Sequence, residues 1–235
     1  MNKAIKVGVA ALALVAVQSV RAQSEEPVVE ESYGWTPVAF GLATPLQLPW
    51  GFDKWDVFGF DFNVFYSQAP LMYGWQVGCA NSVGREMIGL STSGLFNWIS
   101  GDAIGSSITL GLNRTKGTLY GFDAGSVGWH ENVVGCDIEV VGTWQQNITG
   151  CNIAVLGNVT RQESCGCTIG GVCNIADKAY GCQLAGVYNQ AEELHGCQIG
   201  LVNYARECPW GFQIGLVNII LDNTVKVLPI VNGYF

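Results

Sequence analysis

The two histidines, His130 and His195, are the side chains best suited to acid–base chemistry near neutral pH. They stand in different registers of a short repeat, one just after and one just before its strand. Their positions therefore suggest neither a Ser-His-Asp nor a Cys-His pair for nucleophilic catalysis. Both histidines are expected to be solvated or to cap an element.

Cysteines are a second source of chemistry, and the chain has nine of them. Five directly follow a repeat glycine: Cys136, Cys151, Cys167, Cys182 and Cys197. Equivalent residues on neighbouring strands are usually too far apart for a disulfide, so we expect these five to point inward as small apolar residues. The other four could supply a bridge or a free thiol: Cys79, Cys165, Cys173 and Cys208.

Metal, cofactor and catalytic motifs are not found. Cys165-x-Cys167-x5-Cys173 lacks the paired spacing of zinc sites. Neither phosphate-binding glycine motif occurs, and Gly-x-Ser-x-Gly, the motif of a nucleophile elbow, is missing. We therefore expect no catalytic, metal-binding or cofactor-binding residues, no cofactor and no enzymatic activity.

A row of polar residues stands two positions after successive repeat glycines. We call it the polar row: Asp123, Asp137, Asn152, Thr168, Gln183, Gln198 and Gln213. It is expected to face outward, where it could hydrogen-bond a repetitive ligand such as a glycan. Two alternatives to a ligand-binding role are a solvated face and an Asn/Gln ladder that stabilises the stacking of coils. Trp98, Trp129 and Trp144 are expected to pack in the core or on its flank, with a sugar-stacking platform as the alternative.

The element that positions these residues is a repeat of about fifteen residues. Its clearest units are Gly196-Cys-Gln-Ile-Gly-Leu-Val-Asn203 and Gly211-Phe-Gln-Ile-Gly-Leu-Val-Asn218. Apolar and polar residues alternate with period two, which indicates a strand with one buried face, and the polar stretch after each Asn indicates a turn. A repeat glycine recurs eleven times: Gly59, Gly74, Gly89, Gly105, Gly121, Gly135, Gly150, Gly166, Gly181, Gly196 and Gly211.

Two architectures fit this repeat, both all-β. The predicted fold is a parallel β-solenoid of about eleven 15-residue coils, because the connections do not alternate in length and units such as 181–189 carry one extra residue, which a coil corner can absorb. The alternative is an antiparallel outer-membrane β-barrel. The alternating stretch 57–66, the terminal Phe235 and eight tryptophans favour it.

The Gly-x-Gln-Ile-Gly-Leu-Val-Asn pattern over roughly residues 56–235 is similar to bacterial surface-repeat proteins of the leptospiral type. The similarity is specific in the last four repeats, whereas Gly128 and Gly142 stand where Asn is expected. It implies a surface or envelope location and no established activity. No functional residue can therefore be transferred from the family.

The chain divides into a leader and a repeat region. Residues 1–22 read as a signal peptide, 23–32 as an acidic leader, 33–55 as an N-terminal cap, 56–223 as the tandem repeats and 224–235 as a C-terminal cap. Removing Lys3, Lys6 and Arg21 with the signal leaves 8 basic and 19 acidic residues, a net charge of about −11. This balance argues against nucleic acid as a partner.

The expected function is that of a non-catalytic cell-envelope or surface repeat protein with a structural or partner-binding role. Its partner would be a glycan or another envelope component. It would lie at the cell surface, outer membrane or periplasm of a bacterium with an outer membrane. The alternative is an integral outer-membrane β-barrel, including a small pore.

Overall fold

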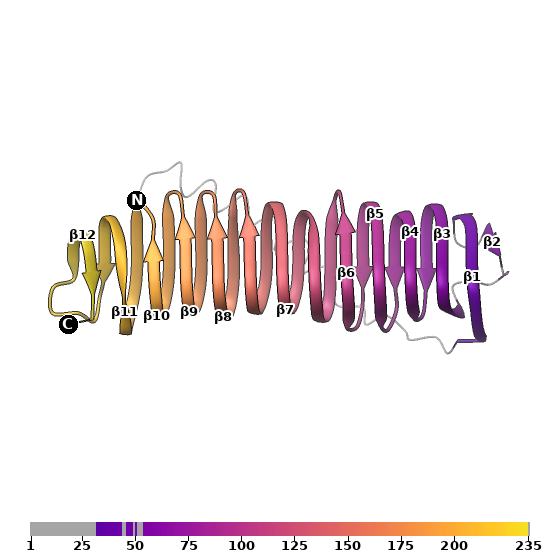
Figure 1. Cartoon of the computed structure of the whole chain (residues 1–235), viewed down its shortest axis with the longest axis horizontal. Helices are drawn as coiled ribbons and strands as arrows, with labels where there is room; N and C mark the ends of the chain where they lie inside the picture. Colours follow the sequence, from indigo (N-terminus) through magenta and orange to yellow (C-terminus); the bar gives the residue numbers. More distant parts are fainter. Residues whose placement is uncertain (1–31, 44–45, 49, 51–53, 235) are drawn as a thin grey trace, which may run out of the picture.

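The computed structural model describes residues 32–43, 46–48, 50 and 54–234 (Figure 1). The predicted signal peptide and all but the last residue of the predicted acidic leader lie outside this part of the chain. None of the described segments is a helix long and apolar enough to cross a bilayer.

Strands make up almost the whole described chain. In order they are β1 (Gly34–Ala43), β2 (Leu46–Leu48), β3 (Trp55–Ala69), β4 (Met72–Val83), β5 (Met87–Ile99), β6 (Ala103–Thr109), β7 (Leu112–Ala154), β8 (Gly157–Gly170), β9 (Cys173–Ala185), β10 (Tyr188–Ile199), β11 (Val202–Ile220) and β12 (Val227–Gly233).

Neighbouring coils run in the same direction. The pairings of β1 with β3 and of β3 through β11 with one another are parallel, and each coil stacks on the previous one along the long axis of the molecule (Figure 1). Only β2 on β1 and β12 on β11 are antiparallel, at the two ends. The predicted parallel β-solenoid of about eleven coils is thus confirmed, and the described chain does not adopt the antiparallel alternative.

The repeat glycines stack in one column and bend each coil. Gly59 pairs with Gly74, which pairs with Gly89. All eleven have φ between +121° and +148°, a conformation that residues with a Cβ rarely adopt. A Cβ on Gly74 would lie 2.0 Å from the carbonyl oxygen of Gly59. The regular glycine spacing therefore reflects both the bend and the close approach of successive coils.

The interior of the solenoid is part apolar and part polar. One apolar cluster runs from Ala39 to Ile148, and a second runs from Ala176 to Ile220. Between these clusters, one column of inward residues changes from apolar to polar. It holds Ala69, Val83 and Ile99 in early coils and Ala176, Ala191 and Ala205 in late coils. In the middle coils the corresponding residues are polar and buried: Thr115, His130, Gln145 and Thr160.

Candidate functional site

The polar row lies inside the coils. All seven of its residues are buried, with exposed fractions from 0% to 3%. The prediction that the row faces outward is therefore wrong, and it cannot be an open glycan-binding surface. Alternation with period two places these residues on one side of the strand, but it does not say which side is inside.

Amide ladders explain why polar residues are tolerated there. In the late coils Gln213 Nε2 donates to Gln198 Oε1 at 2.8 Å, and Gln198 Nε2 donates to Gln183 Oε1 at 2.8 Å. The ladder alternative for the row holds in these coils. Gln198 thus both accepts and donates between coils, so burial leaves neither its amide nitrogen nor its amide oxygen without a partner.

A second column, the asparagine ladder, runs beside the first. Asn189 Nδ2 donates to Asn203 Oδ1 at 2.9 Å, and Asn203 Nδ2 donates to Asn218 Oδ1 at 2.8 Å. In the middle coils this ladder is interrupted. Thr143 pairs with Asn158, so Thr143 and not Gly142 occupies one ladder position. Gly128 occupies the position before it.

A cluster of four ionisable side chains lies at this interruption: Asp123, His130, Asp137 and Glu139. One ligand atom from each lies within 4.8 Å of those of the others, and all four residues are buried. His130 Nε2 is 2.7 Å from Asp123 Oδ2 and 4.0 Å from Asp137 Oδ2. The sequence-based prediction that His130 is solvated or capping is therefore wrong.

Several atoms of this acid–histidine cluster have no hydrogen-bond partner. They are both carboxylate oxygens of Asp137 and Nδ1 of His130. The amide of the buried Gln145, next to His130 in the same column, is also without a partner at both N and O. Buried polar groups are normally paired, so such a concentration is unusual for a purely structural interior.

Burial changes the protonation of the cluster. Burial, followed by repulsion from Asp123 and Asp137, raises the pKa of Glu139 to about 10. Burial also raises the pKa of Asp137 to about 7, against the attraction of His130. Burial alone would lower the pKa of His130, but the hydrogen bond and charge of Asp123 outweigh it and the net shift is upward. All three pKa shifts are upward, so the buried cluster favours bound protons or another source of positive charge.

Two glycines make room for the carboxylate of Glu139. A Cβ on Gly128 would lie 3.1 Å from Glu139 Oε1 and 3.2 Å from His130 Nε2. A Cβ on Gly125 would lie 2.9 Å from Glu139 Oε2. In an ordinary late coil the two inward positions hold the opposite kinds of residue. Gly200 stands at the position of Glu139, four residues after the repeat glycine, and Asn203 stands at the ladder position that Gly128 occupies here. The cluster thus depends on an exchange of glycine and polar residue between two inward positions.

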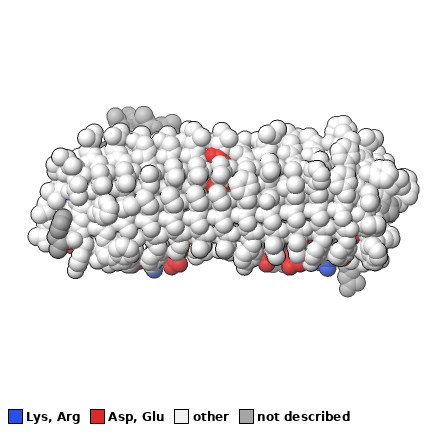
Figure 2. Space-filling model, in the orientation of Figure 1, with Lys and Arg blue, Asp and Glu red and all other residues white. Residues whose placement is uncertain are grey.

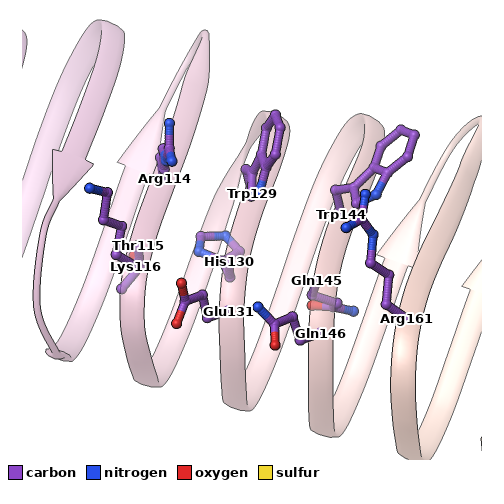
Figure 3. A pocket seen from close by; sticks show the side chains of 10 residues that line it. All are labelled: Arg114, Thr115, Lys116, Trp129, His130, Glu131, Trp144, Gln145, Gln146 and Arg161. Carbon is purple, nitrogen blue, oxygen red and sulfur yellow. The ribbon is translucent and has the colours of Figure 1, made fainter. Parts of the chain in front are cut away.

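A cavity of about 90 Å³ opens beside the cluster (Figure 3). Its lining includes the inward residues Thr115, His130 and Gln145, and Arg114 and Trp129 lie on the same stretches of neighbouring coils. His130 therefore belongs both to the cluster and to the wall of this cavity.

Trp98, Trp129 and Trp144, singled out in the sequence, lie in one column of the coils together with Arg114. Trp98 pairs with Arg114, and the Arg114 guanidinium lies 4.3 Å from the Trp98 ring centre and 5.3 Å from that of Trp129. Burial lowers the pKa of Arg114. All three tryptophans are half-buried, and Arg114 separates Trp98 from Trp129. They therefore form a ladder on the flank of the core, interrupted by a cation.

The other residues singled out in the sequence do not join the cluster. The five repeat cysteines alternate with buried residues on the outer side of the strand and are partly exposed, so the prediction that they point inward is wrong. Cys197 Sγ lies 3.0 Å from Cys182 Sγ, and all nine thiols are free. His195 is 2.6 Å from Glu193 Oε1 and stacks on Tyr180, far along the chain from His130.

Along the outside of the coils, one strip carries no charged residue. We call it the charge-free face, formed by the residues one and three positions after each repeat glycine, none of them buried. They are Phe60, Phe62, Trp75, Val77, Leu90, Thr92, Ser106, Ile108, Phe122, Ala124, Cys136, Ile138, Cys151, Ile153, Cys167, Ile169, Cys182, Leu184, Cys197, Ile199, Phe212 and Ile214. In the view of Figure 2 charged atoms gather along one long edge, and the broad surface above it is almost uncharged.

No family model matches the chain, and no match is found among curated proteins or solved structures.

Proposed function

We propose that this chain is a non-catalytic structural protein of the bacterial cell envelope, which assembles by pairing its charge-free face with that of a second copy. The observation that carries the proposal is the uncharged and mostly apolar strip across all eleven coils. Isolated apolar residues are ordinary on a surface, but contiguous apolar patches of several hundred Å² usually mark an interaction site.

The size of the charge-free face suits a second copy. Eleven coils at about 4.8 Å and a strip about three residues wide give roughly 50 Å by 10 Å, on the order of 500 Å² per copy. Two such faces together bury about 1,000 Å², which is the lower limit for a specific interface. Two regular sheet faces can also pack against each other over their whole length, as in β-sandwiches.

The distribution of charge points the same way. Without its signal the chain has a net charge of about −11, so two copies repel each other wherever their acids meet. Because the charged residues lie off the charge-free face, pairing through this face keeps them apart. The same negative charge opposes contact with an anionic membrane surface.

The envelope location is supported by the sequence of residues 1–22. A basic start, an apolar run of about 11 residues and small residues at Val20 and Ala22 fit a secretory signal, with cleavage before Gln23. Amino-terminal sequencing of the protein recovered from envelope fractions should begin at Gln23.

Sedimentation of the mature chain tests the pairing. We expect a dimer for the wild type and at least a tenfold weaker association for Ile138→Lys with Ile199→Lys, since each would place a charge in the interface. Both isoleucines are 38% exposed, so the fold should tolerate the change. The matched control, Gln162→Lys with Asp177→Asn, adds the same charge at two exposed residues outside the face and should leave the dimer intact.

Two results would contradict this proposal. One is a wild-type chain that remains monomeric at about 100 µM. The other is a monomer that sediments with neutral lipid vesicles and loses this property in the Ile138→Lys, Ile199→Lys chain, because the face would then bind a bilayer surface.

A further inference from the structure

We propose that Asp123, His130, Asp137 and Glu139 bind one divalent transition-metal cation inside the solenoid. This site is independent of the proposed pairing, because all four residues are buried in the coils and none belongs to the charge-free face.

The spacing of the donor atoms fits a single cation. Metal–oxygen and metal–nitrogen bonds are about 2.0–2.4 Å long, so donors on opposite sides of one ion lie roughly 4–5 Å apart. The four donors here lie within 4.8 Å of one another. They come from successive coils, which hold them in register without any loop.

The unpartnered atoms supply a second and separate reason. His130 is 1% exposed in its side chain, it points at Asp123 and Asp137, and its Nδ1 has no partner. Both oxygens of Asp137 are also without hydrogen bonds, and Asn113 is the one side chain whose hydrogen bond lowers the pKa of Glu139. Several buried acceptors aimed at one region cost several kcal/mol unless a cation or protons neutralise them.

The local sequence departs from the repeat in the way that such a site requires. In most other coils the ladder position holds Asn, as at Asn203, and the position four after the repeat glycine holds a small residue, as at Gly200. Here Gly128 takes the ladder position, and the next coil brings Glu139 into the space beside it. The exchange interrupts a stabilising ladder, and it gathers the carboxylates around His130.

The donor chemistry selects the class of cation. Three carboxylates and one imidazole form a mixed oxygen and nitrogen set, which suits Mn²⁺, Fe²⁺ or Zn²⁺ better than the all-oxygen preference of Mg²⁺ or Ca²⁺. The cavity lined by His130 and Gln145 lies beside the imidazole side of the site.

Binding of Mn²⁺ to the whole mature chain tests the proposal, since Mn²⁺ has little affinity for the nine thiols. Electron paramagnetic resonance should show loss of the free Mn²⁺ signal at one ion per chain. Asp137→Asn and Glu139→Gln should each weaken binding tenfold or more, because loss of a ligand costs at least as much as loss of its outer partner. Asp61→Asn, at another buried aspartate of the polar-row position, is the control and should bind as the wild type does.

The two histidines offer a matched spectroscopic pair. Bound Mn²⁺ should show spin-echo modulation from one imidazole nitrogen. The His130→Gln chain should lose this signal and the His195→Gln chain should keep it, because His195 is bonded to Glu193 and lies outside the cluster.

A repaired coil separates metal binding from folding. Gly128→Asn with Glu139→Gly restores the ordinary pair of residues. Removing Glu139 removes the contact that a Cβ at position 128 would make with its carboxylate, and the 3.2 Å approach to His130 Nε2 requires only a shift of a few tenths of an ångström by the imidazole. This chain should unfold at the same temperature as the metal-free wild type or higher, and its melting temperature should not respond to Mn²⁺. That of the wild type should rise with Mn²⁺.

The proposal fails if the wild type binds no Mn²⁺ at millimolar concentration. It also fails if the repaired chain and the Glu139→Gln chain bind Mn²⁺ as tightly as the wild type. A nitrogen signal that survives in His130→Gln would place the ion elsewhere.

Discussion

Each repeat glycine occupies a place where a side chain would collide with the coil before it. Gly74 has φ of +136°, and a Cβ there would lie 2.0 Å from the Gly59 carbonyl oxygen. By contrast, Gly94 has nothing nearer than 3.6 Å to its Cβ position and no positive φ. The glycines of this chain therefore differ in what they contribute to the fold.

At the residue scale, Gly74→Ala should lower the free energy of unfolding by about 2–4 kcal/mol, because backbone strain and a backbone collision add together. Gly94→Ala should change it by less than about 1 kcal/mol. Urea denaturation of the two variants measures the difference. Equal losses in both would show that the close approach of coils at Gly74 is not what requires glycine there.

At the element scale, the coils are held by side-chain ladders as well as by backbone pairing. Asn189 Nδ2 donates to Ile199 O at 2.8 Å and to Asn203 Oδ1 at 2.9 Å, and its Oδ1 accepts from Asn174 at 3.0 Å. One residue thus joins three successive coils. The two separate apolar clusters make such polar links between coils more important than in a domain with one large core.

Asn189→Ala should therefore lower the free energy of unfolding by about 2–4 kcal/mol, since it leaves an Asn203 oxygen and an Ile199 carbonyl unpaired in a dry interior. Its outward neighbour Gln190 bonds only the Tyr188 hydroxyl, at 3.0 Å. Gln190→Ala should cost less than about 1 kcal/mol. Chemical denaturation checks both values. A loss at Asn189 no larger than that at Gln190 would contradict a stabilising ladder.

At the scale of the whole molecule, a stack of parallel coils has two open ends, and each is covered by an antiparallel strand. β12 pairs antiparallel with β11, from Phe212 with Gly233 to Ile219 with Val227. β2 pairs antiparallel with β1 at the other end. An uncovered coil would offer a row of free backbone groups to another molecule.

Removing residues 224–235 should expose the edge of β11 and produce end-to-end polymers that grow with concentration. Light scattering on the truncated and full-length chains measures the effect. The pairing variant Ile138→Lys with Ile199→Lys should not prevent this growth, because the charge-free face runs along the side and not across the end. A truncated chain with the same mass as the full-length chain at every concentration would contradict a protective role for β12.

Much of the fold follows from local pattern. The glycine spacing and the alternation after each glycine predict coils of about fifteen residues, each with a strand after its glycine. Local sequence can predict this because a bend and a pleat are properties of a few consecutive residues. The extra residue in 181–189 does fall at a corner, between the end of β9 at Ala185 and the start of β10 at Tyr188. The candidate site was not predicted, although Gly128 in a ladder position and Glu139 in a glycine position were visible signals.

The amino-acid sequence by itself determined that this chain repeats and that each unit is a strand whose apolar and polar residues alternate after a glycine. Tertiary structure decided which side of each strand is inside. Alternation is symmetrical, so amide ladders that run from coil to coil, rather than hydrophobicity, place the polar row in the interior. Stacking also brought Asp123 next to Asp137 and Glu139, because residues about fifteen apart become neighbours only when successive coils lie in register. His130, about half a coil from Asp123 and from Asp137, reaches them because each coil turns back on itself.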